Sequence, residues 1–265
     1  MTFSSVNTIW VLLGAALVFF MQAGFSLCEA GFTRAKNTGN ILMKNLMDFC
    51  IGTPCFWLFG FGIMFGAGNA IIGWLDPGIM KDYSHVLPNG VPLWAFAIFQ
   101  TVFCATSATI VSGSMAERTK FSAYCIYSAA ISLFIYPISG HWIWGGGWLA
   151  KWGFVDFAGG TVIHITSAFS GLMAILYLGR RADYDECPRP HASNLGLVSI
   201  GSALLMFGWF GFNAGGTGAS DNTAAMAFAN TGIAMICAMV LWSIIDYFVS
   251  GRHWSFEQLM TGPIA

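Results

Sequence analysis

Long apolar stretches, separated by short polar segments, dominate the chain. They run over residues 9–33, 46–75, 92–116, 121–143, 158–179, 195–213 and 223–250. A helix needs about 20 mostly apolar residues to cross the hydrocarbon of a bilayer. We therefore predict seven membrane-spanning helices, and we interpret residues 256–265 as the start of an eighth. Residues 1–8 contain no basic side chain, so they lack the charged region of a cleaved signal peptide, and we expect the first span to be permanent.

Composition strengthens the membrane interpretation. Hydrophobic residues make up 56% of the 265 positions and charged residues only 9%. A soluble core does not require so much apolar surface, so the predicted fold class is an all-α polytopic membrane helix bundle. The 11 basic and 12 acidic residues nearly cancel, which leaves no basic field to attract a nucleic acid.

The positions of the basic residues predict the orientation in the membrane. Polar segments at one side hold only Lys81 and Lys151. Cytoplasmic segments carry an excess of Lys and Arg, so the richer side is predicted to be cytoplasmic, with the N-terminus outside a plasma or inner membrane. The basic residues of that side are Arg34, Lys36, Lys44, Arg118, Lys120, Arg180, Arg181, Arg189 and Arg252.

A short polar pattern occurs twice. Asn37-Thr38 is followed by Asn45, and Asn222-Thr223 is followed by Asn230 at the same spacing. The two copies are five predicted spans apart, and an odd number of spans inverts the second copy. Inverted repeats are typical of transporters, whose binding sites lie at the repeat interface. We therefore predict one membrane domain, with a first five-span repeat over 1–182 and the start of a second over 193–265.

Small residues recur at helical spacing in two spans, and the cysteines are dispersed. Gly62 with Gly66, and Gly211 with Gly215, are predicted to allow close approach between helices. The seven cysteines show no C-x-x-C spacing, so we interpret them as small packing residues rather than as disulfide or metal ligands.

Two ionisable residues flank the start of the fifth span. His164 lies about 12 Å beyond Asp156 if the segment is helical, which places an imidazole well inside the hydrocarbon. An ionisable group at such depth indicates function by default. Two structural alternatives stay open: Asp156 can cap the helix by accepting backbone N–H groups, and His164 can be a packing residue.

The remaining ionisable residues have simpler interpretations. His141 is expected to make packing or loop contacts at the outer end of the fourth span. The acidic residues near cytoplasmic span ends are expected to reach the interface or to pair with Arg or Lys. These acidic residues are Glu29, Asp48 and Asp246, and the loop histidines are His85, His191 and His253.

An intramembrane enzyme that uses Asp156 and His164 is a further function class to consider. The chain lacks an H-E-x-x-H zinc pair and a G-x-S-x-G nucleophile elbow. We therefore predict that the protein is not an enzyme and that it carries neither a metal nor a cofactor.

The segment from Trp144 to Gly147 lies between the fourth and fifth spans. Consecutive glycines let a loop fold tightly beside an aromatic ring. The charge pattern places this loop on the extracellular side. Trp144 can also be an ordinary residue of the aromatic belt at the membrane interface.

Several segments together resemble the ammonium transporter family, in its Amt rather than its Rhesus branch. They occur in the family's order and cover essentially the whole chain. The resemblance implies a trimer of eleven-span subunits, each with its own pore, and this chain corresponds to about the first two-thirds of a subunit. The segments are EAGFTRAKN (29–37), Phe99-Gln100 with Phe103, Ala116-Glu117-Arg118, Trp144-Gly-Gly-Gly, DFAGGTVIH (156–164) and GWFGFNAG (208–215).

The resemblance also implies roles for single residues. Trp144 matches a tryptophan of the outer vestibule that helps to hold the ammonium ion, together with Phe103. Phe103 and Phe212 match two stacked rings that close the pore below it. His164 matches the first of two pore histidines, and Asp156 matches a buried aspartate that supports the recruitment site.

Two departures from the family pattern are visible. Gly216 occupies a position of the recruitment site that is usually serine, so a hydroxyl acceptor is missing there. The second pore histidine belongs to a later span, beyond Ala265. This chain alone is therefore expected to lack part of the pore wall near His164.

The function that the resemblance implies is transport of ammonium or ammonia across a lipid bilayer. The cation would be recruited at the aromatic site, deprotonated, and passed through a hydrophobic pore with proton relay by histidine. An ammonium sensor on the same scaffold is the alternative. A homotrimer and, for a longer form, a PII-type nitrogen-signal protein are the implied partners.

Overall fold

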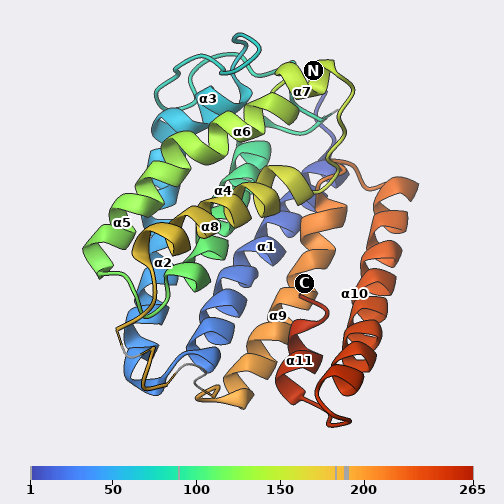
Figure 1. The fold of residues 1–265 in the computed structure, drawn as a ribbon. Coiled ribbons are helices and arrows are strands. Elements are labelled where there is room, and N and C mark those ends of the chain that lie inside the picture. Colours follow the sequence, from blue (N-terminus) through green and yellow to red (C-terminus); the bar gives the residue numbers. More distant parts are fainter. Residues whose placement is uncertain (1, 89, 183, 188–190, 265) are drawn as a thin grey trace.

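The computed structural model describes residues 2–88, 90–182, 184–187 and 191–264, and these form helices and loops without a strand (Figure 1). The helices are α1 Ser5–Phe32, α2 Thr38–Cys55, α3 Phe61–Phe65, α4 Leu93–Met115, α5 Phe121–Ala130, α6 Tyr136–Ile143, α7 Trp148–Lys151, α8 Thr166–Leu178, α9 Leu195–Gly215, α10 Asn222–Val249 and α11 Phe256–Thr261. Wider π-helical turns join α2 to α3 (Phe56–Gly60) and α5 to α6 (Ile131–Ile135), and a third (Gly160–Ile165) leads into α8.

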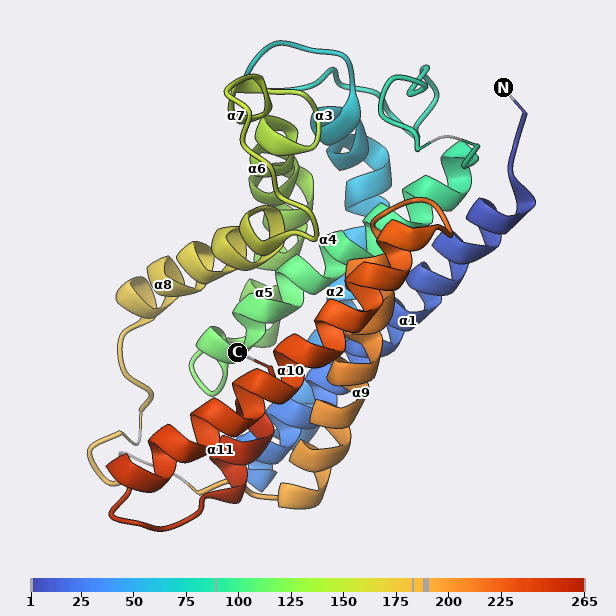
Figure 2. The same cartoon turned by 90° about the vertical axis from the view of Figure 1, so that its right-hand side faces the viewer.

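Seven helical stretches within the described residues are long and apolar enough to cross a membrane. Their bounds are Ser5–Phe32, Ala35–Phe65, Leu93–Met115, Phe121–Lys151, Gly160–Leu178, Leu195–Gly215 and Asn222–Val249. The predicted number of spans is confirmed, and the helices run side by side through the bundle (Figure 2). The short helix α11 begins the segment that was interpreted as a further span.

The predicted bounds of the second span, 46–75, are wrong at both ends. Its helical stretch covers Ala35–Phe65, and the chain from 66 onward is an irregular loop. That loop folds back over the end of α3, where Gly73 N donates to Ile63 O at 2.8 Å. Several of its large apolar side chains are exposed, such as Ile71 at 60% and Trp74 at 55%, and a hydropathy pattern cannot separate an apolar loop of this kind from a span.

The start of α2 escaped prediction because its polar residues are buried. Lys44 Nζ donates to Ser112 O at 2.7 Å and lies 3.5 Å from Glu29 Oε2. Asp48 Oδ2 accepts from Tyr124 at 2.6 Å and from Thr109 at 3.0 Å, and within the described part of the chain this buried carboxylate forms no salt bridge. The expectation that it reaches the interface or pairs with Arg or Lys was therefore wrong. Lys44, which we had counted among the loop cations, is only 3% exposed inside the bundle.

Helices α1 and α9 form the most extensive helix pair of the fold. They are antiparallel, since Gly14 lies against Gly215 near one end and Gly31 lies against Asn194 near the other. The predicted close approach at Gly211 and Gly215 is confirmed. Gly62 is different, because a Cβ there would lie 2.7 Å from Trp74 O of the folded-back loop rather than against a helix.

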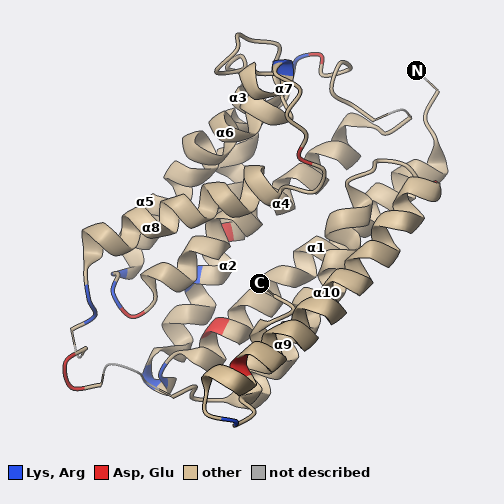
Figure 3. Cartoon of the chain, turned by 45° about the vertical axis from the view of Figure 1, so that its right-hand side comes forward, with Lys and Arg blue, Asp and Glu red and all other residues tan. Residues whose placement is uncertain are grey.

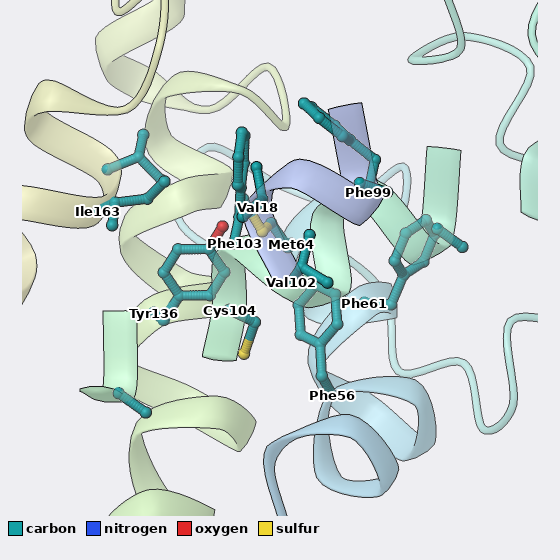
Figure 4. Close-up of a cluster of buried hydrophobic side chains, with 14 of the residues drawn as sticks. Val18, Phe56, Phe61, Met64, Phe99, Val102, Phe103, Cys104, Tyr136 and Ile163 are labelled. Carbon is teal, nitrogen blue, oxygen red and sulfur yellow. The ribbon is translucent and has the colours of Figure 1, made fainter. Parts of the chain in front are cut away.

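Helix α4 lies at the centre of the bundle, and 89% of the residues in its most apolar segment are buried. It packs against α1, α2 and α8 and carries Phe99, Val102 and Phe103 into the aromatic core. Figure 4 shows Phe103 in this core, where its ring centroid lies 4.5 Å from that of Phe99. The core therefore fixes the helix that supplies the central ring of the candidate site.

The outward faces of the peripheral helices are apolar. Only 11% of the residues in the most apolar part of Asn222–Val249 are buried, and 22% in that of Gly160–Leu178. Large side chains such as Leu176 and Phe248 are 69% and 70% exposed. Patches of this size are rare on soluble monomers. They match a protein that is embedded in a bilayer.

Most Lys and Arg residues gather at one end of the bundle, which we call the basic end (Figure 3). There the Glu117 carboxylate accepts from Arg34 N at 2.9 Å and from Arg34 Nε at 3.0 and 3.1 Å, and it also accepts from Asn37 Nδ2 at 2.8 Å. Burial alone would raise the pKa of Glu117, but the hydrogen bonds and the positive charge of Arg34 outweigh it and lower this pKa. Arg189, part of the same predicted cytoplasmic side, lies outside the described residues.

Candidate functional site

Four rings form a column through the bundle. The Trp144 and Phe103 ring centroids are 6.1 Å apart, Phe103 and Phe212 are 4.4 Å apart, and Phe212 and His164 are 5.9 Å apart. The rings come from the turn after α6, from α4, from α9 and from the π-helical turn before α8. The structure therefore brings together four residues that the sequence singled out far apart along the chain.

The Trp144 turn is held by backbone contacts. Both ring nitrogens of His141 lie within 2.9 Å of carbonyl oxygens, those of Met64 and Asn69, which ties α6 to the folded-back loop. The prediction that His141 makes packing or loop contacts is confirmed. Gly146 has a φ of 79°, which favours glycine, and a Cβ on Gly145 would lie against Met64 O.

Asp156 organises the start of the fifth span. Its Oδ1 accepts from the amides of Gly159 and Gly160 at 2.8 and 3.0 Å, and its Oδ2 accepts from the amides of Thr161 and Val162, both at 2.8 Å. The capping interpretation of Asp156 is confirmed. All four bonds involve backbone N–H groups that a helix start leaves without a partner.

The backbone of Asp156 also fixes the first ring of the column. Its carbonyl oxygen accepts from Trp144 Nε1 at 2.8 Å. Gly159, with a φ of 96°, lets the chain turn into the span, and a Cβ there would lie 3.2 Å from the Trp144 ring. One short segment thus positions both Trp144 and the turn that carries His164.

His164 and Phe212 both border a cavity of about 570 Å³. The cavity is bounded by α9, α10 and the segment after α11, including Asn213, Thr231 and Ile264. The imidazole is partly buried and forms no hydrogen bond with the described residues, so its two nitrogens are available to a small molecule in that space.

A second cavity, of about 200 Å³, lies on the opposite side of Phe103. Trp144, Phe103 and Gly216 all border it, so the three predicted recruitment residues meet in one place. We call this space the outer cavity. Its full lining is Phe65, Val86, Pro88, Phe96, Phe99, Gln100, Phe103, Trp144, Phe157 and Gly216.

Gln100 is a site residue to which sequence reasoning assigned no role. It stands in the apolar run of α4, and a polar amide in a membrane span is itself a signal of function. The motif around Phe99 and Phe103 attracted attention for its rings only, and the amide between them was left unexplained.

Comparison with known proteins identifies the family and the fold. The family model described as the Ammonium Transporter Family matches residues 9–265. The chain belongs to the ammonium transporter family. Its relatives include ammonium transporter Amt2 of Archaeoglobus fulgidus, which is 43% identical over 93% of this chain, and ammonium transporter 1 of Dictyostelium discoideum, which is 40% identical over 91%.

Solved structures of this family superpose closely on the chain. A structure described as a sensor Amt protein has a TM-score of 0.90 at 35% identity and covers 98% of this chain. Mep2 of Candida albicans has a TM-score of 0.90 at 30% identity and covers 99%. Together with the seven apolar helices, these matches establish a multi-pass membrane protein with the ammonium transporter fold.

The chain is shorter than these relatives. It spans 55% and 53% of the length of the two transporters and 66% and 59% of the two solved chains. The two curated relatives are named as ammonium transporters, and the matching family model is that of a transporter family.

Proposed function

We propose that the protein carries ammonium or ammonia across a membrane along the column of Trp144, Phe103, Phe212 and His164. The observation that carries the proposal is the column itself, whose successive ring centroids lie 4.4–6.1 Å apart. Family membership supports the substrate, since the relatives are named as ammonium transporters.

The energetics of such a path favour removal of a proton. Transfer of a bare ammonium-sized cation into a low-dielectric interior has an idealised cost of order 20 kcal/mol. A neutral molecule without hydrogen-bond partners costs roughly 2–7 kcal/mol. The aromatic faces of Trp144 and Phe103 attract a cation by about 0.5–2 kcal/mol, which concentrates it in the outer cavity without trapping it.

Below the outer cavity, the ring pair of Phe103 and Phe212 acts as the gate in this proposal. One N–H bond of ammonium breaks above the gate as its proton passes to a water molecule in the outer cavity, and neutral ammonia then passes the gate separately from that proton. His164 receives ammonia at the inner face of Phe212, where imidazole can donate a hydrogen bond, accept one or relay a proton. Asp156 supports the site by holding Trp144 and the His164 turn.

The proposed assembly follows the family. The protein is a homotrimer with a pore in each subunit, built from the inverted repeats 1–182 and 193–265, and a longer form would bind a PII-type signal protein. The N-terminus lies outside a plasma or inner membrane, with the basic end in the cytoplasm. The positions of Lys and Arg at that end support this orientation.

An ammonium sensor is the second candidate function. It is favoured by the similarity to the solved sensor Amt protein, which is 35% identical. A sensor would bind ammonium in the outer cavity and conduct little.

Uptake of radiolabelled methylammonium tests the proposal. Cells that lack ammonium uptake should accumulate the label when they express the protein, and ammonium should compete. Phe212→Ala should change the rate, whereas Phe248→Ala, on an outward face, should not. Uptake equal to that of cells without the protein would overturn the transport proposal.

A further inference from the structure

The outer cavity contains one buried amide without a partner. Gln100 is 7% exposed, its Oε1 is fully buried and accepts no hydrogen bond, and its Nε2 donates none to the described residues. A buried polar group without a partner lowers the stability of the fold. Because neither end of this amide has a partner among the described residues, it is free to bind a ligand in the cavity that it borders.

The other buried polar side chains of α4 are all satisfied, so Gln100 is the exception on its helix. Its neighbour Thr101 donates to Ala97 O at 2.7 Å, and Thr106 donates to Val102 O at 2.9 Å. Ser107, Thr109 and Ser112 bond to Ser167, Asp48 and Glu29, respectively. Helix α4 thus pairs its polar groups everywhere except at the outer cavity.

A second glutamine offers a matched comparison. Gln22 is also 7% exposed, but its Nε2 donates to Thr109 Oγ1 at 3.0 Å and to Asn45 O at 3.4 Å. The two glutamines are therefore equally buried, but Gln22 has hydrogen-bond partners and Gln100, in the outer cavity, has none among the described residues.

The outer cavity otherwise offers few side-chain acceptors. Ammonium carries four N–H donors, and the bordering rings attract its charge without accepting a directed hydrogen bond of normal strength. Trp144 uses its only donor on Asp156 O. Gly216 has no side chain, although a Cβ there would lie 3.5–3.7 Å from the nearest oxygens, so a serine would fit.

We infer that the amide oxygen of Gln100 is the hydrogen-bond acceptor of the outer cavity and sets its affinity and preference for ammonium in place of an acceptor at residue 216. The two ends of an amide have nearly the same shape, and rotation by 180° exchanges them. A ligand that only donates selects the orientation with oxygen toward the cavity. This inference rests on the proposed function and adds a specificity-determining residue to it.

The test measures the half-saturating ammonium concentration of currents from reconstituted protein. Gln100→Leu keeps the size and removes the acceptor, so this concentration should rise about tenfold, as expected for one hydrogen bond to a charged group. Gln100→Glu keeps an acceptor and should stay at or below the wild-type concentration. The matched control Gln22→Leu should leave the concentration unchanged.

The link to residue 216 gives a second readout. Gly216→Ser should lower the half-saturating concentration, and Gln100→Leu should have a smaller effect in that background. A Gln100→Leu concentration within twofold of wild type, or a loss of maximal current alone, would overturn the inference and leave Gln100 a structural residue.

A binding measurement separates this inference from the transport proposal. Ammonium chloride, compared with sodium chloride, should raise the melting temperature of the wild-type protein more than that of Gln100→Leu. Binding that depends on Gln100 without any current would refute transport and keep the inference. Equal ammonium-dependent shifts in the two proteins would refute the inference.

Discussion

Replacement of Asp156 by Ala should destabilise the protein far more than loss of an ordinary helix cap. The carboxylate accepts four backbone N–H groups at 2.8–3.0 Å, and three of them are partly buried. Each amide left without a partner costs about 1–2 kcal/mol, which gives roughly 3–6 kcal/mol for the three. A single cap is worth about 0.5–2 kcal/mol.

Asp221 is the matched control for this prediction. It caps the start of α10, and within the described residues its carboxylate accepts from a single backbone amide, that of Ala224, at 3.0 Å. The free energy of unfolding, measured by titration with SDS in detergent micelles, should fall by roughly 3–6 kcal/mol in Asp156→Ala and by about 1 kcal/mol in Asp221→Ala. Asp156→Asn keeps one acceptor oxygen and should lose about half as much as Asp156→Ala.

Activity should follow the same order. Because the backbone oxygen of Asp156 accepts from Trp144 Nε1, a shift of the segment displaces the first ring of the column. Methylammonium uptake should therefore fall strongly in Asp156→Ala and remain in Asp221→Ala. If Asp156→Ala lost no more stability than Asp221→Ala, the four amide bonds would not hold the start of the fifth span, and this reasoning would be wrong.

Three further predictions address other parts of the molecule. His164→Leu and His164→Asp should each change the charge carried per substrate, measured as current against uptake, whereas His191→Leu should not; unchanged ratios would make His164 a packing residue. The lowered pKa of Glu117 stabilises the fold above its ordinary value of 4.5, and this stability is lost as the pH falls through the lowered pKa. The melting temperature of the wild-type protein should therefore fall below pH 4.5, whereas that of Glu117→Gln should change little over the same range. Parallel melting-temperature profiles of the two proteins would contradict this account. Gly215→Leu should lower the melting temperature far more than Gly39→Leu, because a Cβ at Gly215 lies 3.2 Å from a facing backbone and one at Gly39 meets open space.

The sequence predicted the number of spans because the bilayer sets the apolar length of each span, and runs of about 20 apolar residues can be recognised directly along the chain. It began the second span too late because hydropathy treats Lys44 as exposed, whereas this side chain is buried and donates to Ser112 O within the bundle. The folded-back loop was mistaken for part of the span because it is apolar, although Trp74 is 55% exposed, and backbone contacts such as that from Gly73 N to Ile63 O hold it. Long-range contacts decide both ends of the second span, and they leave no periodic trace along the chain.

The candidate site was predicted mainly through resemblance, since 24 phenylalanines give no reason to choose Phe103 and Phe212. The structure adds the ring distances of the column and the four bonds of Asp156. The unpaired amide of Gln100 could not be predicted from the sequence, because an amide is recognised as unpaired only when all of its neighbours are placed.

Currents from the protein in a solid-supported membrane test the central proposal most directly. A jump in ammonium concentration should produce a saturable current that decays faster as more protein is reconstituted, and equal jumps in sodium or potassium should produce none. Trp144→Leu should raise the half-saturating ammonium concentration. A protein that binds ammonium but gives no current above that of protein-free vesicles would contradict transport along the ring column and would favour the sensor.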